Sequence, residues 1–288
     1  MRDITGVFSE KRQHWVGDGF PVRSLLSHHA AGAPASPFLL LDHAGPHEFA
    51  PKLGQPRGVG AHPHKGFETV TIVYDGEVEH RDSTGAGGVI GPGDVQWMTA
   101  GDGIIHEEFH SPEFTRKGGA FEMVQLWVNL PAKDKSAPAG YQNITNDMIP
   151  VVENNGASVR VIAGAYGEVD GPARTFTDIN VWDVRVAKSQ TMTLPVPASH
   201  NVSLVVLNGA VVLGEVAFTD GATLMLAPGE ADVEIGVTEG TKLVVLSGEP
   251  IDEPVFAYGP FVMNTEAEIR TAIADFNAGR FGRIAQAA

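Results

Sequence analysis

The sequence predicts an all-β protein with two similar β-barrels in tandem and a short C-terminal helix. The 34 glycines and 19 prolines among 288 residues indicate many turns, which favours strands over helices. The apolar segments are short and are separated by glycine-containing turns, as in antiparallel barrels and sandwiches. A strand-and-turn pattern of the first half also recurs in the second half. With 43% hydrophobic residues, the chain is long enough for two domains, each with its own core.

The first half contains three strand-rich segments. Residues 67–78 predict a hairpin, because Asp75-Gly76 favours the turn that matches strand twist. Residues 89–98 predict a strand, a turn and a second strand, and residues 121–130 predict one more strand.

A polar segment flanked by prolines, residues 131–140, then interrupts the apolar pattern. Such composition is typical of a boundary between domains. We therefore predict an N-terminal domain of residues 1–131 and a C-terminal domain of residues 140–288.

Two alignments indicate that the halves are duplicated. Residues 202–211 align with the strand and turn that start at Val70, so that Gly209 falls opposite Gly76 at an offset of 133. Residues 227–230 align with residues 91–94 at an offset of 136. Duplicated barrels would explain both matches.

The C-terminal end predicts a helix. Thr265 and Glu268 have the spacing of a capping box, and Gly279 supplies a stop signal. Apolar residues follow at helical spacing, namely Ile269, Ala272, Ile273 and Phe276.

Composition excludes several classes of function. The net charge of −15 repels phosphate backbones, so direct nucleic-acid binding is not expected. The absence of cysteine excludes disulfides and thiolate ligands. No signal peptide or membrane-spanning apolar stretch is visible, and we expect a cytoplasmic protein without membrane contact. We also expect a monomer, because fused barrels supply within one chain the packing that single barrels obtain by dimerising.

Two short motifs predict a metal site, His62-Pro63-His64 and His106-Glu107-Glu108. On a strand, alternate side chains share one face, so each motif presents a pair of ligands. If the two strands are neighbours, four ligands converge. Imidazole and carboxylate together suit iron, manganese, nickel, copper or zinc better than calcium or magnesium.

The strand argument does not distinguish between two carboxylates for the fourth ligand. Glu68 lies four residues after His64 and would share its face on a regular strand, although Gly66 can introduce a bulge. Glu68 and Glu108 are therefore alternatives. The other histidines of the first half are weaker candidates: His28, His29, His43, His47 and His80 are expected at the surface, and His110 is a second-tier candidate.

The repeat serves as an internal control. Shifting the four ligands by 133 or 136 residues gives Pro195, Pro197, Lys242 and Val244, none of which is a ligand in this setting. The metal is therefore expected in the N-terminal domain alone.

The sequence closely resembles pirins, which are members of the bicupin superfamily. The resemblance spans most of the chain and rests on residues 62–70, 92–101 and 103–108, with further matches at residues 37–42, 125–130 and 259–265. It implies two jelly-roll cupin barrels, with iron, as Fe(II), in the N-terminal one. The ligand types keep Mn, Ni, Cu or Zn as alternatives. The implied ligands are His62, His64, His106 and Glu108, which favours Glu108 over Glu68.

The resemblance also implies two kinds of function. Some pirins resemble quercetin 2,3-dioxygenases, which open a flavonol with O2 and release carbon monoxide. In such an enzyme Glu108 would accept the proton of the flavonol hydroxyl. Other pirins are regulatory partners of transcription factors or metabolic enzymes. A zinc or manganese isomerase on the same barrel is a third possibility. The leading expectation is an iron-dependent dioxygenase with a small aromatic or flavonol-like substrate.

Overall fold

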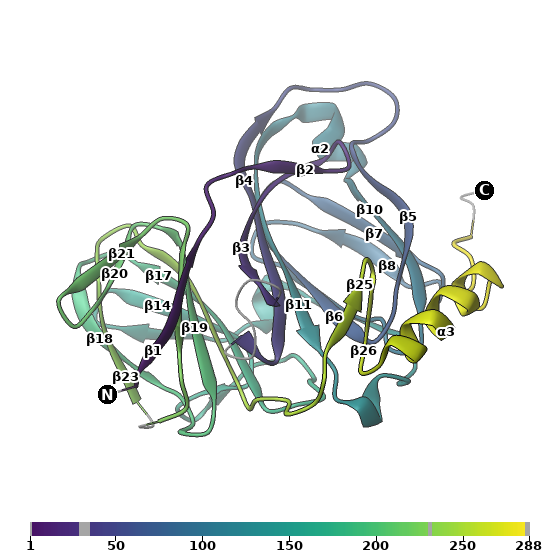
Figure 1. The fold of residues 1–288 in the computed structure, drawn as a ribbon. Helices are drawn as coiled ribbons and strands as arrows, with labels where there is room; N and C mark the ends of the chain where they lie inside the picture. Colours follow the sequence, from purple (N-terminus) through teal and green to yellow (C-terminus); the bar gives the residue numbers. More distant parts are fainter. Residues whose placement is uncertain (1, 29–34, 230–231, 286–288) are drawn as a thin grey trace. The chain divides into compact units, whose positions relative to one another are not determined.

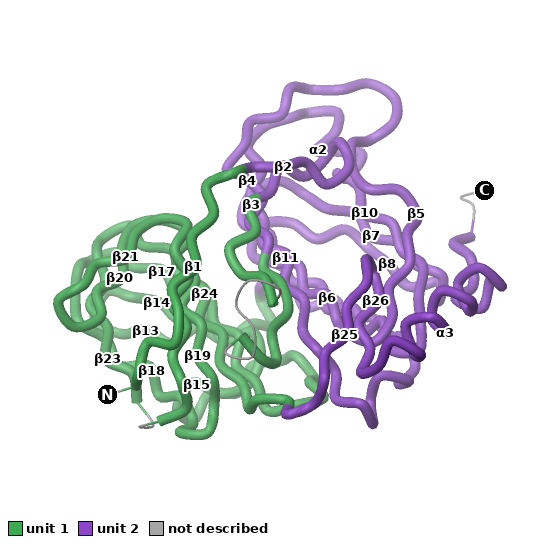
Figure 2. The backbone as a smooth tube through the Cα atoms, in the orientation of Figure 1, with its two compact units in different colours: residues 1–12, 23–41, 147–251 green, residues 13–22, 42–146, 252–288 purple. Residues whose placement is uncertain are grey.

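The computed structural model describes residues 2–28, 35–229 and 232–285. Its strands and two helices divide into two compact units, coloured separately in Figure 2. One unit comprises residues 13–22, 42–146 and 252–288 and is called the N-terminal barrel. The other comprises residues 1–12, 23–41 and 147–251 and is called the C-terminal barrel. Figure 1 labels many of the helices and strands.

The N-terminal barrel is built from two antiparallel sheets. The larger sheet has the order β12 (Gly140–Ile144), β9 (Val95–Thr99), β6 (Phe67–Asp75), β11 (Gly119–Asn129), β4 (Phe38–Phe49), β3 (Phe20–Ser27) and β2 (His14–Val16). Residues 23–27 of β3 and 38–41 of β4 are assigned to the other unit. The smaller sheet has the order β5 (Gly58–His64), β10 (Ile104–His110), β7 (Val78–Asp82) and β8 (Gly87–Ile90). Outside the sheets lie α2 (Pro112–Lys117), two 3-10 turns, Ala132–Asp134 and Asn146–Met148, the pair β25 (Phe256–Tyr258) and β26 (Phe261–Met263), and α3 (Glu266–Asn277).

The C-terminal barrel repeats this arrangement. Its larger sheet has the order β1 (Ile4–Ser9), β22 (Ala222–Leu226), β19 (Asn201–Asn208), β24 (Lys242–Gly248), β17 (Ile179–Val186), β14 (Ala157–Ala163) and β13 (Val151–Asn154). Its smaller sheet has the order β18 (Gln190–Pro195), β23 (Asp232–Val237), β20 (Ala210–Leu213) and β21 (Val216–Thr219). A short pair, β15 (Ala165–Tyr166) and β16 (Val169–Asp170), stands apart. The predicted all-β fold with two barrels is confirmed.

Alternation along the strands places the two cores inside the barrels. In the C-terminal barrel, Trp182, Leu204 and Val245 are fully buried in one aliphatic cluster. The core of the N-terminal barrel is more aromatic, with Phe20 and Phe121 in its centre.

The units do not coincide with the predicted boundary at residues 131–140. Strand β12 follows that segment but hydrogen-bonds to β9 of the N-terminal barrel. The first strand, β1, pairs with β22 of the C-terminal barrel. The C-terminal helix belongs to the N-terminal barrel, because residues 252–288 return to it. Composition identified a polar segment here, but it does not reveal which strands exchange partners.

The repeat is confirmed for its first match and is wrong for its second. Gly76 and Gly209 both have positive φ. Gly76 lies in the turn between β6 and β7, and Gly209 lies in the turn between β19 and β20. Gly93, however, corresponds to Gly221 and not to Gly229. Gly93 donates its N–H to Val73 at 2.8 Å, and Gly221 donates its N–H to Val206 at 2.9 Å. The matching offset is 128, because the whole segment from Gly209 to Gly221 is shorter than that from Gly76 to Gly93. The loop between β20 and β21, residues 214–215, is one of the shortened parts, since residues 83–86 join β7 to β8. Glu230, the last residue of the expected match, lies outside the described residues.

Helix α3 confirms the Thr265 half of the predicted capping box, while Glu268 reaches the N–H of the residue before the cap. The Thr265 hydroxyl accepts the N–H of Glu268, and the Glu268 carboxylate accepts the N–H of Asn264. Gly279 follows the helix with a φ of 73°. None of the described helices is long and apolar enough to cross a membrane.

The turn between β5 and β6 depends on Gly66. Its φ is 87°, and a Cβ atom there would lie 2.1 Å from the carbonyl oxygen of Val262. The turn is also fixed by a 2.8 Å hydrogen bond from the Gly66 N–H to the carbonyl of Gly101. This turn determines which side chains of β5 and β6 face the barrel interior.

We expect Gly66→Ala to lower the free energy of unfolding by about 3 kcal/mol, since positive-φ strain is added to a backbone clash. Gly54→Ala is the matched control, because Gly54 has the same φ of 87° but open space around it. It should cost about 1 kcal/mol. Urea unfolding of both variants measures the difference, and equal losses would show that the contact with Val262 is unimportant.

Candidate metal centre

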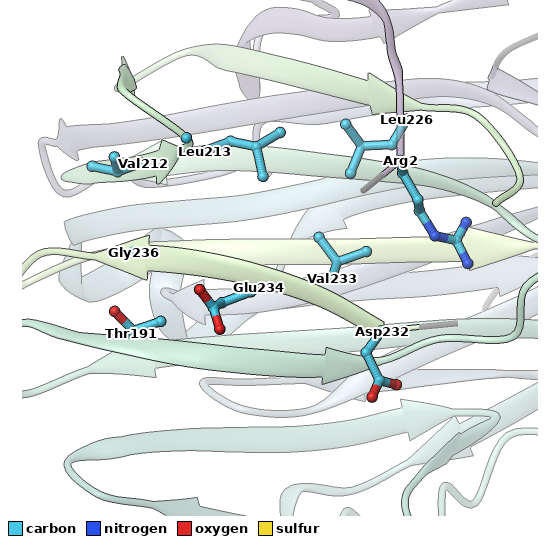
Figure 3. Close-up of a pocket in the computed structure, with 10 residues that line it drawn as sticks. Arg2, Thr191, Val212, Leu213, Leu226, Asp232, Val233, Glu234 and Gly236 are labelled. Atoms are coloured by element: carbon cyan, nitrogen blue, oxygen red, sulfur yellow. The ribbon is translucent and has the colours of Figure 1, made fainter. Parts of the chain in front are cut away.

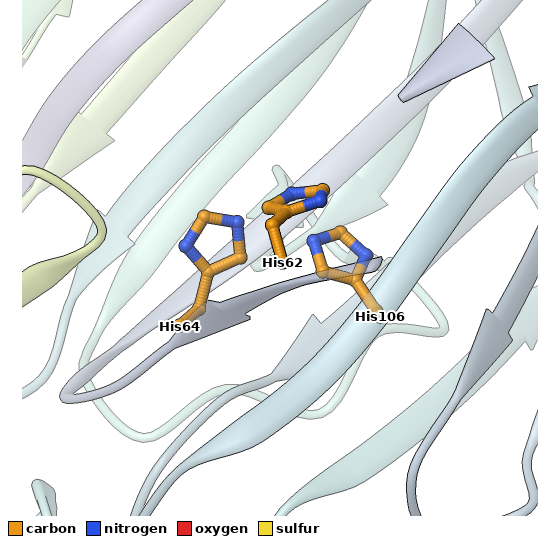
Figure 4. A group of neighbouring side chains, drawn as sticks. All are labelled: His62, His64 and His106. Atoms are coloured by element: carbon orange, nitrogen blue, oxygen red, sulfur yellow. The ribbon is translucent and has the colours of Figure 1, made fainter. Parts of the chain in front are cut away.

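Three histidine rings converge inside the N-terminal barrel (Figure 4). His62 and His64 extend from β5, and His106 extends from the neighbouring β10, where it is paired directly with His62. The ring centroid of His106 lies 4.3 Å from that of His62 and 4.9 Å from that of His64. Potential ligand atoms of all three lie within 4.8 Å of one another. The strand adjacency that the motifs required is therefore present.

Two of these rings carry buried nitrogens that lack a hydrogen-bond partner. Among the described residues, Nδ1 of His64 and Nε2 of His106 have none. Buried polar atoms are ordinarily satisfied, so these nitrogens fit a bound ion. Nδ1 of His62 is 2.8 Å from the Gly60 carbonyl, so that its other nitrogen, Nε2, is available to bind a metal ion.

Burial also keeps two of the rings neutral. Desolvation, reinforced by the proximity of His62, lowers the pKa of His64 to about 3. Desolvation followed by repulsion from His64, His62 and His80 lowers the pKa of His106 well below its ordinary value. Neutral imidazole is the form that binds a metal ion.

Glu108 lies on the same strand as His106 and is buried. One carboxylate oxygen accepts hydrogen bonds from the amide of Gln96 and, at 3.5 Å, from the hydroxyl of Thr71. The other oxygen accepts a 2.8 Å hydrogen bond from the amide of Gln125. These donors fix the carboxylate, which belongs to a second group of potential ligands together with His80 and His106.

His80 is the residue that the sequence interpretation missed. It was expected at the surface, but it is fully buried and its ring stacks on that of Tyr141 at a centroid distance of 4.8 Å. Strand β7 places it directly opposite Glu108 on β10. The available signal was the alternation of His80 and Asp82 on a strand next to the motif around His106.

Two other histidines are also buried: His43, which was expected at the surface, and His110, the second-tier candidate. His43 contacts the carboxylate of Glu122 at 3.1 Å. His110 contacts the Gly19 carbonyl at 3.0 Å and packs among phenylalanine rings. Both therefore have structural partners. His29 lies outside the described residues.

Glu68 is on the opposite face of β6 from Thr71, which contacts Glu108. The register of β6 with β9 and β11 has no bulge between Glu68 and Thr71, and an offset of three positions places two side chains on opposite faces of a strand. The carboxylate of Glu68 instead accepts a 2.7 Å hydrogen bond from Thr99. Glu68 was expected to share the strand face of His64, four residues earlier. This expectation fails because the turn at Gly66 separates the two residues into different strands.

Glu68 provides a prediction about pH. Burial, opposed by the hydrogen bond from Thr99, raises its pKa from 4.5 to about 7. A raised carboxyl pKa means that the folded state binds the proton more tightly, so this stabilisation is lost as pH rises from about 4.5 through about 7. Glu68→Gln should remove that loss and increase the free energy of unfolding at pH 8 by up to about 3 kcal/mol.

Urea unfolding at pH 5 and pH 8 tests this expectation. Identical pH dependence in the variant and the unaltered chain would contradict it. The variant should also keep the full metal content, because Glu68 faces away from Glu108.

A small cavity adjoins His62 and Glu108. Its volume is about 30 Å³, and apolar residues such as Phe20, Val22 and Val59 line it. This space accommodates about one water molecule, whereas pockets for drug-sized ligands measure roughly 300–1,000 Å³. A flavonol therefore requires movement of the lining side chains.

The C-terminal barrel has aliphatic residues at the corresponding positions. With Val211 taken as the equivalent of Val78, the strand pairings make Val233 the equivalent of His106 and Ile235 the equivalent of Glu108. Leu194, the partner of Val233, then replaces His62. All three belong to the buried aliphatic cluster. The sequence shift of 136 gave Lys242 and Val244, which instead lie on β24, the counterpart of β11.

The C-terminal barrel does contain a larger cavity, of about 440 Å³ (Figure 3). Its lining combines Arg2 with Asp232, Glu234 and aliphatic residues such as Leu213. Both groups of potential metal ligands among the described residues lie in the N-terminal barrel. The two barrels therefore differ in interior chemistry while sharing a strand plan.

Comparisons with known proteins agree with this architecture. The Pirin family model matches residues 19–128, and that of the Pirin C-terminal cupin domain matches residues 181–282. A Pseudomonas aeruginosa relative named "Putative quercetin 2,3-dioxygenase PA2418" is 52% identical over 285 residues, which cover 98% of this chain and 99% of the relative. The crystal structure of a quercetin 2,3-dioxygenase from Acinetobacter baumannii is 51% identical with a TM-score of 0.95, and the match covers 99% of this chain and 100% of that one.

A more distant structure shows the same fold. The Escherichia coli pirin YhhW, solved in complex with nickel(II), is 19% identical with a TM-score of 0.62. The match covers 85% of this chain and 100% of that chain.

Proposed function

The chain belongs to the pirin family, and from this premise we propose that it is a metal-dependent dioxygenase of the quercetinase type. The proposed ligands are His62, His64, His106 and Glu108, and the proposed metal is iron(II). The relatives named for quercetin dioxygenation at 51% and 52% identity support the reaction type. The nickel(II) complex of YhhW supports the choice of a transition metal as the bound ion.

The observation that carries the proposal is the pair of buried, unpartnered ring nitrogens on His64 and His106. Three imidazoles and one carboxylate suit a divalent transition metal, and they leave coordination positions open on an octahedral ion. The residues of the site therefore fit the group that the family implies. A bound ferrous ion would supply Lewis-acid and redox chemistry between substrate and O2.

Glu108 is the proposed acceptor of the proton from a flavonol hydroxyl. The amides of Gln96 and Gln125 hold its carboxylate in place, so that its position does not depend on the ion alone. Apolar side chains such as Phe20 and Val22 line part of the cavity beside Glu108, which limits the room for water there. Proton transfer to a positioned carboxylate requires hydrogen-bond contact with the substrate hydroxyl.

The proposal is tested by anaerobic reconstitution with ferrous iron, followed by quercetin and O2. We expect consumption of quercetin with release of carbon monoxide. The metal-free protein provides the control and should show neither. Lack of metal-dependent turnover with quercetin or related flavonols would contradict the dioxygenase.

The identity of the metal has its own test. Elemental analysis of protein purified without added metal should find iron at about one ion per chain. If the analysis instead finds manganese, nickel, copper or zinc at about one ion per chain, that metal replaces iron in the proposal.

A second function, a metal-dependent protein-binding module, is favoured by the size of the cavity. A space of about 30 Å³ holds no flavonol without rearrangement. In this alternative the ion stabilises the barrel and its surface, and turnover is incidental. Pull-downs with metal-loaded and metal-free protein should then recover a partner that depends on the metal, and recovery of no such partner would count against it.

A further inference from the structure

His80 is the buried neighbour of the proposed ligand His106. Its Nδ1 lies 3.4 Å from Nδ1 of His106, and its Nε2 lies 3.1 Å from a carboxylate oxygen of Asp82. Stacking on Tyr141, with 19° between the ring planes, fixes the orientation of the imidazole. All these residues belong to the N-terminal barrel.

Asp82 determines which nitrogen of His80 carries the proton. Its other oxygen accepts hydrogen bonds from the N–H and hydroxyl of Thr84, at 2.8 and 2.6 Å, and from the N–H of Ala86 at 3.2 Å. Burial opposes the charge of Asp82, but hydrogen bonds from His80 and Thr84 outweigh it and lower the pKa of this carboxyl. An ionised carboxylate only accepts, so Nε2 of His80 must be the donor.

The remaining protons follow from that assignment. A neutral His80 with hydrogen on Nε2 presents a lone pair on Nδ1. The contact with His106 then requires hydrogen on Nδ1 of His106. A neutral His106 with hydrogen on Nδ1 has a lone pair on Nε2, which is its buried nitrogen without a hydrogen-bond partner.

We propose that Asp82 and His80 are positioning residues that hold His106 in the tautomer whose Nε2 binds the metal ion. The inference rests on the proposed metal centre and adds to it two residues that act through His106. Metal-binding imidazoles ordinarily donate their second N–H to a carboxylate, a backbone carbonyl or water, and such an acceptor orients the ring and makes it more basic. Here the lone pair on Nδ1 of His80 would take the place of that acceptor.

The competing role for His80 is that of a ligand. His80, His106 and Glu108 also form a group that can hold an ion, with two histidines and one carboxylate. However, both nitrogens of His80 already have partners, Asp82 and His106, whereas His106 retains an unpartnered nitrogen. The hydrogen-bond pattern therefore favours positioning over ligation.

The tautomers are measured by long-range ¹H–¹⁵N NMR of histidine-labelled protein, both metal-free and loaded with zinc. We expect hydrogen on Nε2 of His80 and on Nδ1 of His106 in both states, with zinc shifting Nε2 of His106. Hydrogen on Nδ1 of His80, or two zinc ions per chain, would overturn the inference. Failure of the unaltered chain to bind zinc would instead contradict the metal centre itself.

Chelator competition with zinc gives the second readout. His80→Leu removes the acceptor for His106 and should weaken zinc binding 10- to 100-fold. His80→Asn places an amide oxygen near the former Nδ1 and should recover a large part of the affinity. His110→Leu removes another buried histidine, one without contact to the three-histidine cluster, and should bind zinc as the unaltered chain does. Equal zinc affinity in His80→Leu and the unaltered chain would overturn the inference.

Discussion

Replacing His106 by alanine should abolish metal binding and, with it, flavonol turnover. His106 is common to both groups of potential ligands, and its Nε2 is one of the two buried nitrogens without a partner. Alanine removes the imidazole that would bind the ion. We expect no other side chain of β10 to replace it as a ligand. Elemental analysis after dialysis should find no ion above background, and the reconstituted variant should release no carbon monoxide.

The control for this variant is His110→Ala. His110 is also buried on β10, but it contacts the Gly19 carbonyl and phenylalanine rings. We expect it to retain the ion despite some loss of stability, which circular dichroism would monitor. Full metal content in His106→Ala, or equal loss in both variants, would contradict the assignment of His106.

Replacing Glu108 by glutamine should lower kcat by about 10²- to 10⁴-fold, the usual contribution of a general base. The amide keeps an oxygen that can face the ion, so metal content should fall far less than in His106→Ala. It cannot accept the proton of the flavonol hydroxyl. The donors Gln96 and Gln125 both point at this side chain, so a small local rearrangement is also expected.

Glu107→Gln is the matched control for Glu108→Gln. Glu107 is on the same strand but on the other face, where its carboxylate pairs with Arg81 at 3.1 Å. Its turnover should match that of the unaltered protein. A Glu108→Gln variant whose kcat stays within a factor of about three would exclude Glu108 as the base.

The sequence predicted the part of the site that depends on local alternation. His62 with His64, and His106 with Glu108, share faces because strand side chains alternate, and β5 does pair with β10. The register shift between His106 and Glu108 was not predictable from either motif alone. It places Val59 opposite Glu108, while β7 brings His80 to the other side of Glu108.

The parts that failed depend on non-local pairing or on backbone conformation. His80 is important only because β7 lies beside β10, and its own sequence context reads as an exposed hairpin strand. The parity argument for Glu68 assumed a continuous strand, which the positive φ of Gly66 interrupts. The exchange of β1 and of the C-terminal helix between the two halves leaves no trace in composition.

The most direct test of the metal centre is anomalous diffraction from crystals of the metal-loaded protein, recorded at the absorption edge of the ion found by elemental analysis. We predict one peak per chain, bounded by His62, His64, His106 and Glu108, and none in the C-terminal barrel. A peak held by His80 in place of His62 and His64, or no peak in the N-terminal barrel, would contradict it.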